Sequence, residues 1–127
     1  VGSEMCIRDR GGITQGAGQV FCEQAIYDQS GQLLTGSFMD YAMPRPGLVD
    51  GLMLIEHPVP TATNPLGAKG VGEAGVTGSL PALMNAVLDA LRTQGVTHFD
   101  MPASPQRIWR ALQSAKAGQP SALSVHA

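Results

Sequence analysis

Apolar residues recur at the spacing of an amphipathic helix in three stretches of this chain, and each recurrence predicts a helix. The apolar positions are Ile13, Ala17, Val20 and Phe21 in the first stretch, Leu80, Leu83, Val87, Ala90 and Leu91 in the second, and Ile108, Trp109, Ala111 and Leu112 in the third. Because four glycines lie within residues 11–18, the first helix needs close tertiary contact to form.

Start and stop signals place the ends of the second and third helices. Ser79 is the expected N-cap of the second helix, with Pro81 in its first turn, and Gly95 ends it. Ser104 is the expected cap of the third helix, where Trp109 should be a packing anchor.

Other stretches have the pattern of strands. Residues 25–28 and 32–36 flank Gln29-Ser30-Gly31, which predicts a hairpin. Residues 52–56 form a near-continuous apolar run, which favours a strand covered on both faces, and residues 96–101 predict another short strand. Helices and strands together predict an α+β fold.

Composition narrows the class of protein. At 127 residues, with 43% hydrophobic and 14% charged residues, the chain can form one domain with a core. The net charge of −2 and the scattered basic residues argue against a nucleic-acid-binding protein. Cys6 and Cys22 lack the spacing of metal ligands, so no protein metal site is predicted. We find no apolar run of membrane-spanning length and expect a cytoplasmic protein.

The most informative segment is Gly67-Ala68-Lys69-Gly70-Val71-Gly72-Glu73-Ala74-Gly75, in which Glu73 is the only acid. Its glycines allow positive φ and a close approach of the main chain to a ligand, so that N–H groups can converge on an anion. Glu73 comes just ahead of a predicted helix, whose dipole favours an ionised carboxylate.

Three interpretations of this loop remain open on spacing alone. Residues 70–75 fit G-x-G-x-x-G, but Asn64-Pro65-Leu66-Gly67 is not the buried strand that a dinucleotide site requires. The phosphate-loop pattern fails because Lys69 is followed by Gly70. The loop is therefore a catalytic or ligand-binding segment, a nucleotide-binding module, or a non-catalytic structural connection.

The first ten residues form a separate problem. They contain no initiating methionine and resemble translated adapter sequence from assembled reads, so we expect residues 1–10 to be an artefact. Residues 11–115 would then form the folded piece, and residues 116–127 a flexible tail.

Four motifs in order resemble the C-terminal part of the molybdenum-binding large subunit of the xanthine dehydrogenase family, closest to its aerobic carbon monoxide dehydrogenase branch. They are Gly-Gly-Ile-Thr-Gln-Gly-Ala-Gly-Gln at 11–19, Gly-Ser-Phe-Met-Asp-Tyr-Ala-Met-Pro at 36–44, Thr-Asn-Pro-Leu-Gly-Ala-Lys-Gly-Val-Gly-Glu-Ala-Gly at 63–75, and Asp-Met-Pro at 100–102 with Pro-Gln-Arg-Ile-Trp at 105–109. The resemblance covers about residues 11–112 and implies a piece of a larger α+β molybdopterin-binding domain.

The resemblance also implies a chemistry. The family's catalytic glutamate falls on Glu73, which would act as general base by taking the proton of a molybdenum-bound hydroxyl as that oxygen attacks an electron-poor carbon. Lys69, Gly70, Val71 and Gly72 match the backbone beside molybdopterin cytosine dinucleotide. The pterin would hold the molybdenum, so no protein ligand is expected.

Electrons would leave through [2Fe-2S] and FAD centres on a small iron–sulfur subunit and a medium FAD-binding subunit, in a dimer of heterotrimers.

The chain departs from the family's pattern at one position. Relatives have a Gly-Gln pair just upstream of Gly11-Gly12, and its glutamine contacts the cofactor, whereas this chain has Cys-Ile-Arg-Asp-Arg at 6–10. Either the expected artefact has overwritten the pair or the chain has lost it. The rest of the cofactor pocket and the substrate-selecting loops would lie in upstream sequence, so the chain alone is expected to be inactive.

Overall fold

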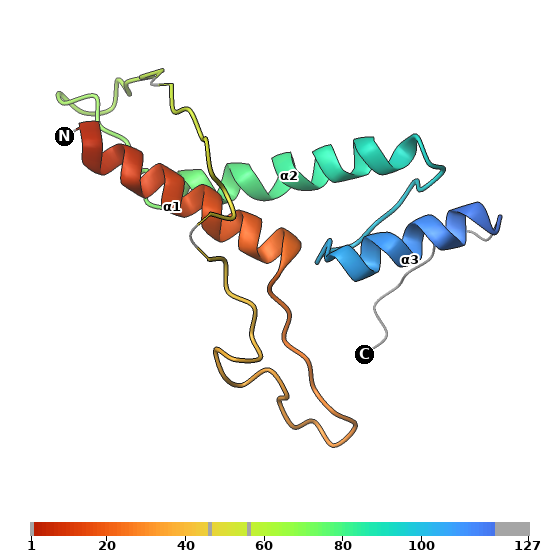
Figure 1. Ribbon diagram of the computed structural model, residues 1–127. Helices are drawn as coiled ribbons and strands as arrows, with labels where there is room; N and C mark the ends of the chain where they lie inside the picture. Colours follow the sequence, from red (N-terminus) through yellow and green to blue (C-terminus); the bar gives the residue numbers. More distant parts are fainter. Residues whose placement is uncertain (1, 46, 56, 119–127) are drawn as a thin grey trace.

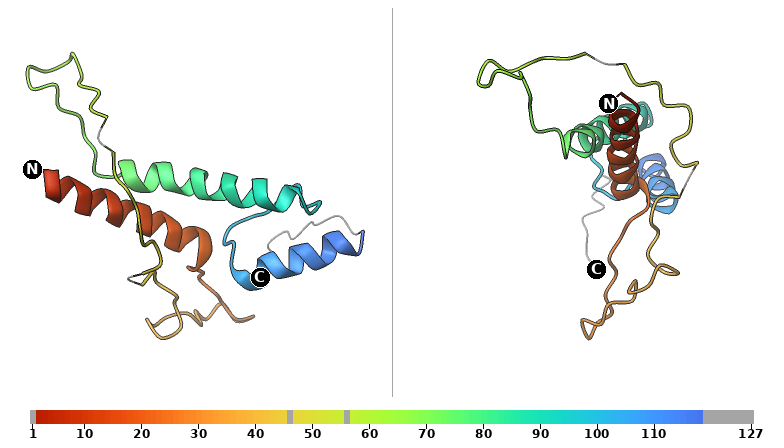
Figure 2. Two further views of the ribbon diagram at one scale, coloured as in Figure 1. Left: turned by 45° about the horizontal axis from the view of Figure 1, so that its top comes forward. Right: turned by 90° about the vertical axis from the view of Figure 1, so that its left-hand side faces the viewer.

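The computed structural model describes residues 2–45, 47–55 and 57–118, with side chains from Ile7 onward, and contains three helices. They are α1 (Gly2–Phe21), α2 (Ala74–Arg92) and α3 (Pro105–Lys116). Figure 1 shows α1 and α2 side by side, with α3 beside the far end of α2. Residues 22–73 leave this helical group in two long excursions, which both views of Figure 2 show extending away from the helices.

Helices α1 and α2 run parallel and pack through their smallest residues. Gly12 of α1 faces Gly75 of α2, and one turn further on Gly16 faces Ser79. The lack of side chains at Gly12 and Gly16 lets the two backbones approach closely. This confirms that the glycine-rich first helix needs close tertiary contact.

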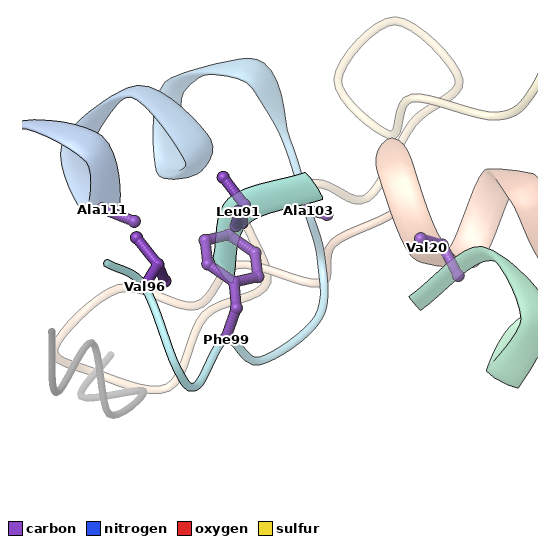
Figure 3. Close-up of a cluster of buried hydrophobic side chains, with 6 residues drawn as sticks. All are labelled: Val20, Leu91, Val96, Phe99, Ala103 and Ala111. Atoms are coloured by element: carbon purple, nitrogen blue, oxygen red, sulfur yellow. The ribbon is translucent and has the colours of Figure 1, made fainter. Parts of the chain in front are cut away.

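The hydrophobic core lies at the far end of this helix pair, where α2, α3 and the connection between them meet the last turn of α1. Figure 3 shows its buried members, which are Val20, Leu91, Val96, Phe99, Ala103 and Ala111. Val20 and Val96 are fully buried, and the Ala103 N–H donates a hydrogen bond to the Val20 carbonyl. The core thus joins all three helices at one end and leaves the N-terminal ends of α1 and α2 outside it.

Helix α2 begins six residues earlier than predicted. Its N-cap is Glu73, whereas Ser79 lies buried inside the helix and its hydroxyl donates to the Val76 carbonyl at 3.2 Å. Pro81 is consequently an interior residue and not part of the first turn. The sequence signal misled because Ser79 is required for packing on α1. At the other end Gly95 has φ +85, in agreement with its expected role as terminator.

Helix α3 agrees with the prediction at its start, since Ser104 is the N-cap and Pro105 occupies the first position. The prediction that Trp109 is a packing anchor is wrong for this chain, in which this residue is 60% exposed. Of the tail predicted at 116–127, Lys116 ends α3, and residues 119–127 lie outside the described part of the chain.

The predicted strands are not formed within the described residues. Tyr27 and Leu33 make an isolated antiparallel bridge, which confirms the hairpin in its shortest form. The stretch predicted as a covered strand is irregular instead, and Met53 and Ile55 in it are each 81% exposed. Residues 96–101 are also unpaired, although Val96 and Phe99 are buried. A strand needs a neighbour for its backbone hydrogen bonds, and the described residues offer none here.

Residues 2–10, expected to lie outside the fold, form the first half of α1.

Helix α2 is the one described helix long and apolar enough to cross a membrane, with mean hydropathy 1.2 over an 18-residue window. The sequence prediction overlooked it because polar residues interrupt its apolar positions. Core helices of soluble proteins have the same length and composition, so this feature alone is weak evidence for a membrane protein.

Candidate functional site

The loop Lys69–Glu73 connects the second excursion to the start of α2. Glu73 is the N-cap residue, with φ −113° and ψ 6°, and its carbonyl accepts a hydrogen bond from the Thr77 N–H at 3.0 Å. Its side chain is exposed and makes no capping hydrogen bond. The carboxylate therefore lies at the positive end of the helix dipole, as expected, and is available to an external group.

The backbone carbonyls of Val71 and Glu73 accept hydrogen bonds from the first turn of α2, from the Ala74 N–H at 3.3 Å and the Thr77 N–H at 3.0 Å, whereas the N–H groups of the loop are free of internal partners in the described part of the chain. Within residues 57–118, no N–H group of residues 69–73 donates a hydrogen bond. Gly70 and Gly72 have no atom within 4 Å of an added Cβ, and neither has positive φ. Among the loop glycines only Gly67 does, at +64°, so the expectation that these glycines share positive φ was wrong.

The segment ahead of the loop is a turn built around Asn64. Its side-chain oxygen accepts hydrogen bonds from the Leu66 and Ala68 N–H groups, each at 3.1 Å, and its amide nitrogen donates to the Ala68 carbonyl at 2.9 Å. Such a closed side-chain turn is typical of asparagine. Residues 57–69 contain no strand, so the dinucleotide interpretation lacks the structural element that it requires just before Gly70.

Two hollows flank the loop. One, of about 720 Å³, is lined in part by Lys69 and Val71 together with Leu54 and Asp9. The other, of about 490 Å³, lies over the first turns of α2 and includes Gly75, again with Leu54 and Asp9. Of the predicted site residues, the structure thus brings Lys69 and Val71 into one hollow, whereas Gly70, Gly72 and Glu73 line neither.

Asp9 lines both hollows, which the sequence did not reveal. Its carbonyl also lies 3.2 Å from the position of a Cβ on Gly75, so the N-terminal half of α1 contacts the start of α2. The N-terminal half of α1 is therefore adjacent to the glycine loop. The matching four-residue spacings of Gly12 with Gly16 and of Gly75 with Ser79 were the available signal for this contact.

Shifted pKa values lie away from the loop. Partial burial, together with the negative charge and hydrogen-bonding contact of Glu23 at 3.3 Å, raises the pKa of Tyr41. The pKa of Asp28 is lowered, chiefly because its carboxylate accepts a hydrogen bond from the Ser30 hydroxyl at 2.6 Å. Among the described residues, no three His, Cys, Asp or Glu side chains gather as metal ligands would.

Comparison with known proteins identifies the family. A family model described as "Molybdopterin cofactor-binding domain" matches residues 9–49. The nicotine 6-hydroxylase large subunit of Paenarthrobacter nicotinovorans is 37% identical over 102 residues, which are 80% of this chain and 12% of that protein. The chain belongs to the molybdenum hydroxylase large-subunit family. The resemblance found in its motifs is thereby confirmed.

Other members of this family of oxidoreductases show the same relation. The carbon monoxide dehydrogenase large chain of Hydrogenophaga pseudoflava is 38% identical over 104 residues, covering 81% of this chain and 13% of that one. The crystal structure of quinoline 2-oxidoreductase from Pseudomonas putida 86 superposes with a TM-score of 0.80 at 37% identity, over 86% of this chain and 14% of that one. The chain thus spans less than one sixth of the length of these relatives.

Proposed function

We propose that this chain supplies the general base of a molybdenum hydroxylase, and that Glu73 is that base in the oxidative hydroxylation of a small carbon substrate. The position of Glu73 supports the proposal: an exposed carboxylate at the N-terminus of α2, next to unpaired backbone N–H groups. A general base must be reachable by the group that gives up the proton, and an exposed carboxylate with no internal hydrogen bond meets that requirement.

We propose that Lys69, Gly70, Val71 and Gly72 contact the molybdopterin cofactor, in its cytosine dinucleotide form. Their fit to such a group rests on the open N–H groups and on the empty space at Gly70 and Gly72. Because neither glycine has positive φ or a neighbour that excludes a side chain, folding of this chain alone gives no reason for glycine there. A ligand lying against the backbone does give one.

When bound, the cofactor would supply the two-electron oxidation and the oxygen that enters the product. The role of this chain is to accept the proton released from that oxygen on a carboxylate oxygen of Glu73, while the loop orients the cofactor through backbone donors. The exposed ammonium group of Lys69 would balance negative charge on the cofactor.

The wider assembly follows as part of the same proposal. We propose a cytoplasmic α+β large subunit that passes electrons to a [2Fe-2S] subunit and an FAD-binding subunit in a dimer of heterotrimers, with this chain inactive on its own. Relatives carry names such as "large subunit" and "dehydrogenase complex subunit gamma", which are names of subunits in larger assemblies. Residues 52–55 have no strand partner in the described part of the chain, and Met53 and Ile55 are exposed. Strands from the rest of such a subunit would pair with this stretch and cover these side chains.

The test is Glu73→Gln in the full-length enzyme, because glutamine keeps the shape of glutamate but accepts no proton at neutral pH. We expect unchanged molybdenum content and a loss of kcat of about a hundredfold or more, the typical contribution of a general base. Asp89→Asn makes the same chemical change at an exposed carboxylate near the C-terminal end of α2, far from the loop, and should leave kcat unchanged. Near-normal turnover of Glu73→Gln would mean that the loop is structural.

A further inference from the structure

We infer that Gly12 and Gly75 are positioning residues for Glu73: the contact of their backbones fixes where α2 begins, and with it the place of the carboxylate. This inference rests on the proposed function of Glu73. It concerns a contact between two helices that are far apart in the sequence, whereas the proposed function concerns the loop alone.

The contact is too close for a Cβ on Gly12 or Gly75 unless the backbones shift by a few tenths of an ångström. A Cβ on Gly12 would lie 3.0 Å from Gly75 Cα and 3.1 Å from the Val76 nitrogen. A Cβ on Gly75 would lie 3.2 Å from both the Asp9 carbonyl oxygen and Gly12 Cα. All of these neighbours are backbone atoms, which cannot rotate away as a flexible side chain would. Any larger residue must therefore move one helix relative to the other.

Movement at Gly75 is transmitted directly to Glu73. Gly75 is the second residue of α2, and Glu73 is the N-cap that bonds to Thr77 in the same turn. Since the hydrophobic core holds the opposite end of α2 through Leu91, a displacement at Gly75 tilts the N-terminal end outward. A catalytic group misplaced by about 1 Å can cost on the order of a hundredfold in rate.

The chain provides a matched control on each helix. Gly11 adjoins Gly12, and Gly78 lies in the same helix as Gly75, yet neither has any atom within 4 Å of an added Cβ. Alanine at Gly11 or Gly78 changes helix propensity in the same way as alanine at Gly12 or Gly75, without creating an overlap. A difference between the members of each pair therefore reports the contact and not the composition of the helix.

The experiment compares Gly12→Ala and Gly75→Ala with Gly11→Ala and Gly78→Ala in the full-length holoenzyme. We expect the first pair to lower kcat at least about tenfold, with KM changed less than about twofold and molybdenum content retained, because positioning affects the transition state more than binding. In the molybdenum-free protein as well, amide hydrogen exchange in residues 69–76 should be faster for the first pair only. Equal behaviour of the two pairs would overturn the inference.

A double variant separates positioning from general disruption. If Gly75 acts through Glu73, Gly75→Ala should cause almost no further loss of kcat in the Glu73→Gln background. An undiminished further loss would show that Gly75 acts independently of the carboxylate and would overturn the inference. If instead Glu73→Gln itself turns over normally, the proposed function fails, and the hydrogen-exchange comparison still decides whether the contact orders the loop.

A rescue pair covers the case in which Gly75→Ala does not fold. One turn further along, a Cβ on Gly16 would overlap the Ser79 hydroxyl oxygen and lie 3.1 Å from Ser79 Cβ. Here the nearest atoms belong to the Ser79 side chain and not to the backbone, so Gly16→Ala should lower kcat by less than Gly75→Ala, and Ser79→Gly should restore most of the loss by removing those atoms. A Gly16→Ala loss that Ser79→Gly does not relieve would contradict the inference.

Discussion

The helical group and the stretch between α1 and α2 use their apolar residues in opposite ways. In the helices, Val20, Leu91 and Val96 are buried against one another at the end where α1, α2 and α3 meet. In residues 22–73, large apolar side chains face solvent, with Met39 94% exposed and Met53 81% exposed. We call residues 22–73 the open stretch. This chain superposes on the quinoline 2-oxidoreductase structure over 86% of its length, so most of the open stretch has the same conformation as in that relative.

This contrast shows which part of the chain specifies its own structure. The helices satisfy their backbone hydrogen bonds internally, and they have a core to cover their apolar faces. The described part of residues 22–73 forms only scattered turn and bridge hydrogen bonds and has no core of its own, and the chain covers only 14% of the quinoline 2-oxidoreductase chain on which it superposes. We therefore expect stability within this chain to come from the helical group alone.

The largest effect expected from this comparison is in the core. Leu91→Ala should lower the free energy of unfolding of the 127-residue chain by about 2–5 kcal/mol, since it removes a side chain that is only 6% exposed and leaves a cavity. Denaturant titration followed by circular dichroism at helical wavelengths measures it. A loss below about 1 kcal/mol would contradict a core centred on α2.

A smaller effect is expected in the open stretch. Met39→Ala should change the stability of the 127-residue chain by less than about 0.5 kcal/mol, because the side chain contacts mainly water there. In the full-length subunit the same variant should cost about as much as a core truncation, if the remainder of the subunit covers this side chain. Equal and negligible changes in both proteins would show that Met39 is a surface residue throughout.

The smallest effect is the acid sensitivity of the hairpin turn. The pKa of Asp28 is lower in the folded chain than its ordinary value of 3.8, so the turn gains stability above that pH and loses it as the pH falls through the lowered value. Ser30→Ala should raise the pKa of Asp28 toward the ordinary value. Carboxyl carbon NMR titration measures the midpoint, and Ser37→Ala, whose hydroxyl bonds Asp40 instead, serves as the control. An unchanged midpoint in Ser30→Ala would exclude this hydrogen bond as the cause.

The sequence predicted correctly those features of the fold that depend on neighbouring residues, and it failed where a feature depends on contacts with distant parts of the chain. Periodicity identified all three helices, and Ser104 with Pro105 located the start of α3 correctly, because these signals are local. The start of α2 was misplaced because Ser79 resembles a cap but is buried against Gly16 of α1. The run at 52–55 has a strand's composition, but pairing depends on a partner strand that the described residues lack.

The candidate site was predictable as a segment but not as an arrangement. Spacing and resemblance together selected Lys69 to Glu73, and the resemblance alone attached a role to Glu73. The adjacency of Asp9 and Gly12 to this loop required the three-dimensional structure, because α1 reaches it across more than fifty intervening residues. The absence of internal contacts at Gly70 and Gly72 was likewise invisible in a pattern of glycines.

The long separation between α1 and α2 has a consequence during synthesis on the ribosome. Once α1 has emerged, residues 22–73 must still be translated before the first residue of α2 exists, a delay of about three to ten seconds at typical elongation rates. Throughout that interval a segment rich in glycine has little tendency to stay helical by itself. Of these two helices, the one made first thus becomes permanent only after the other exists, and a nascent-chain chaperone would find it available.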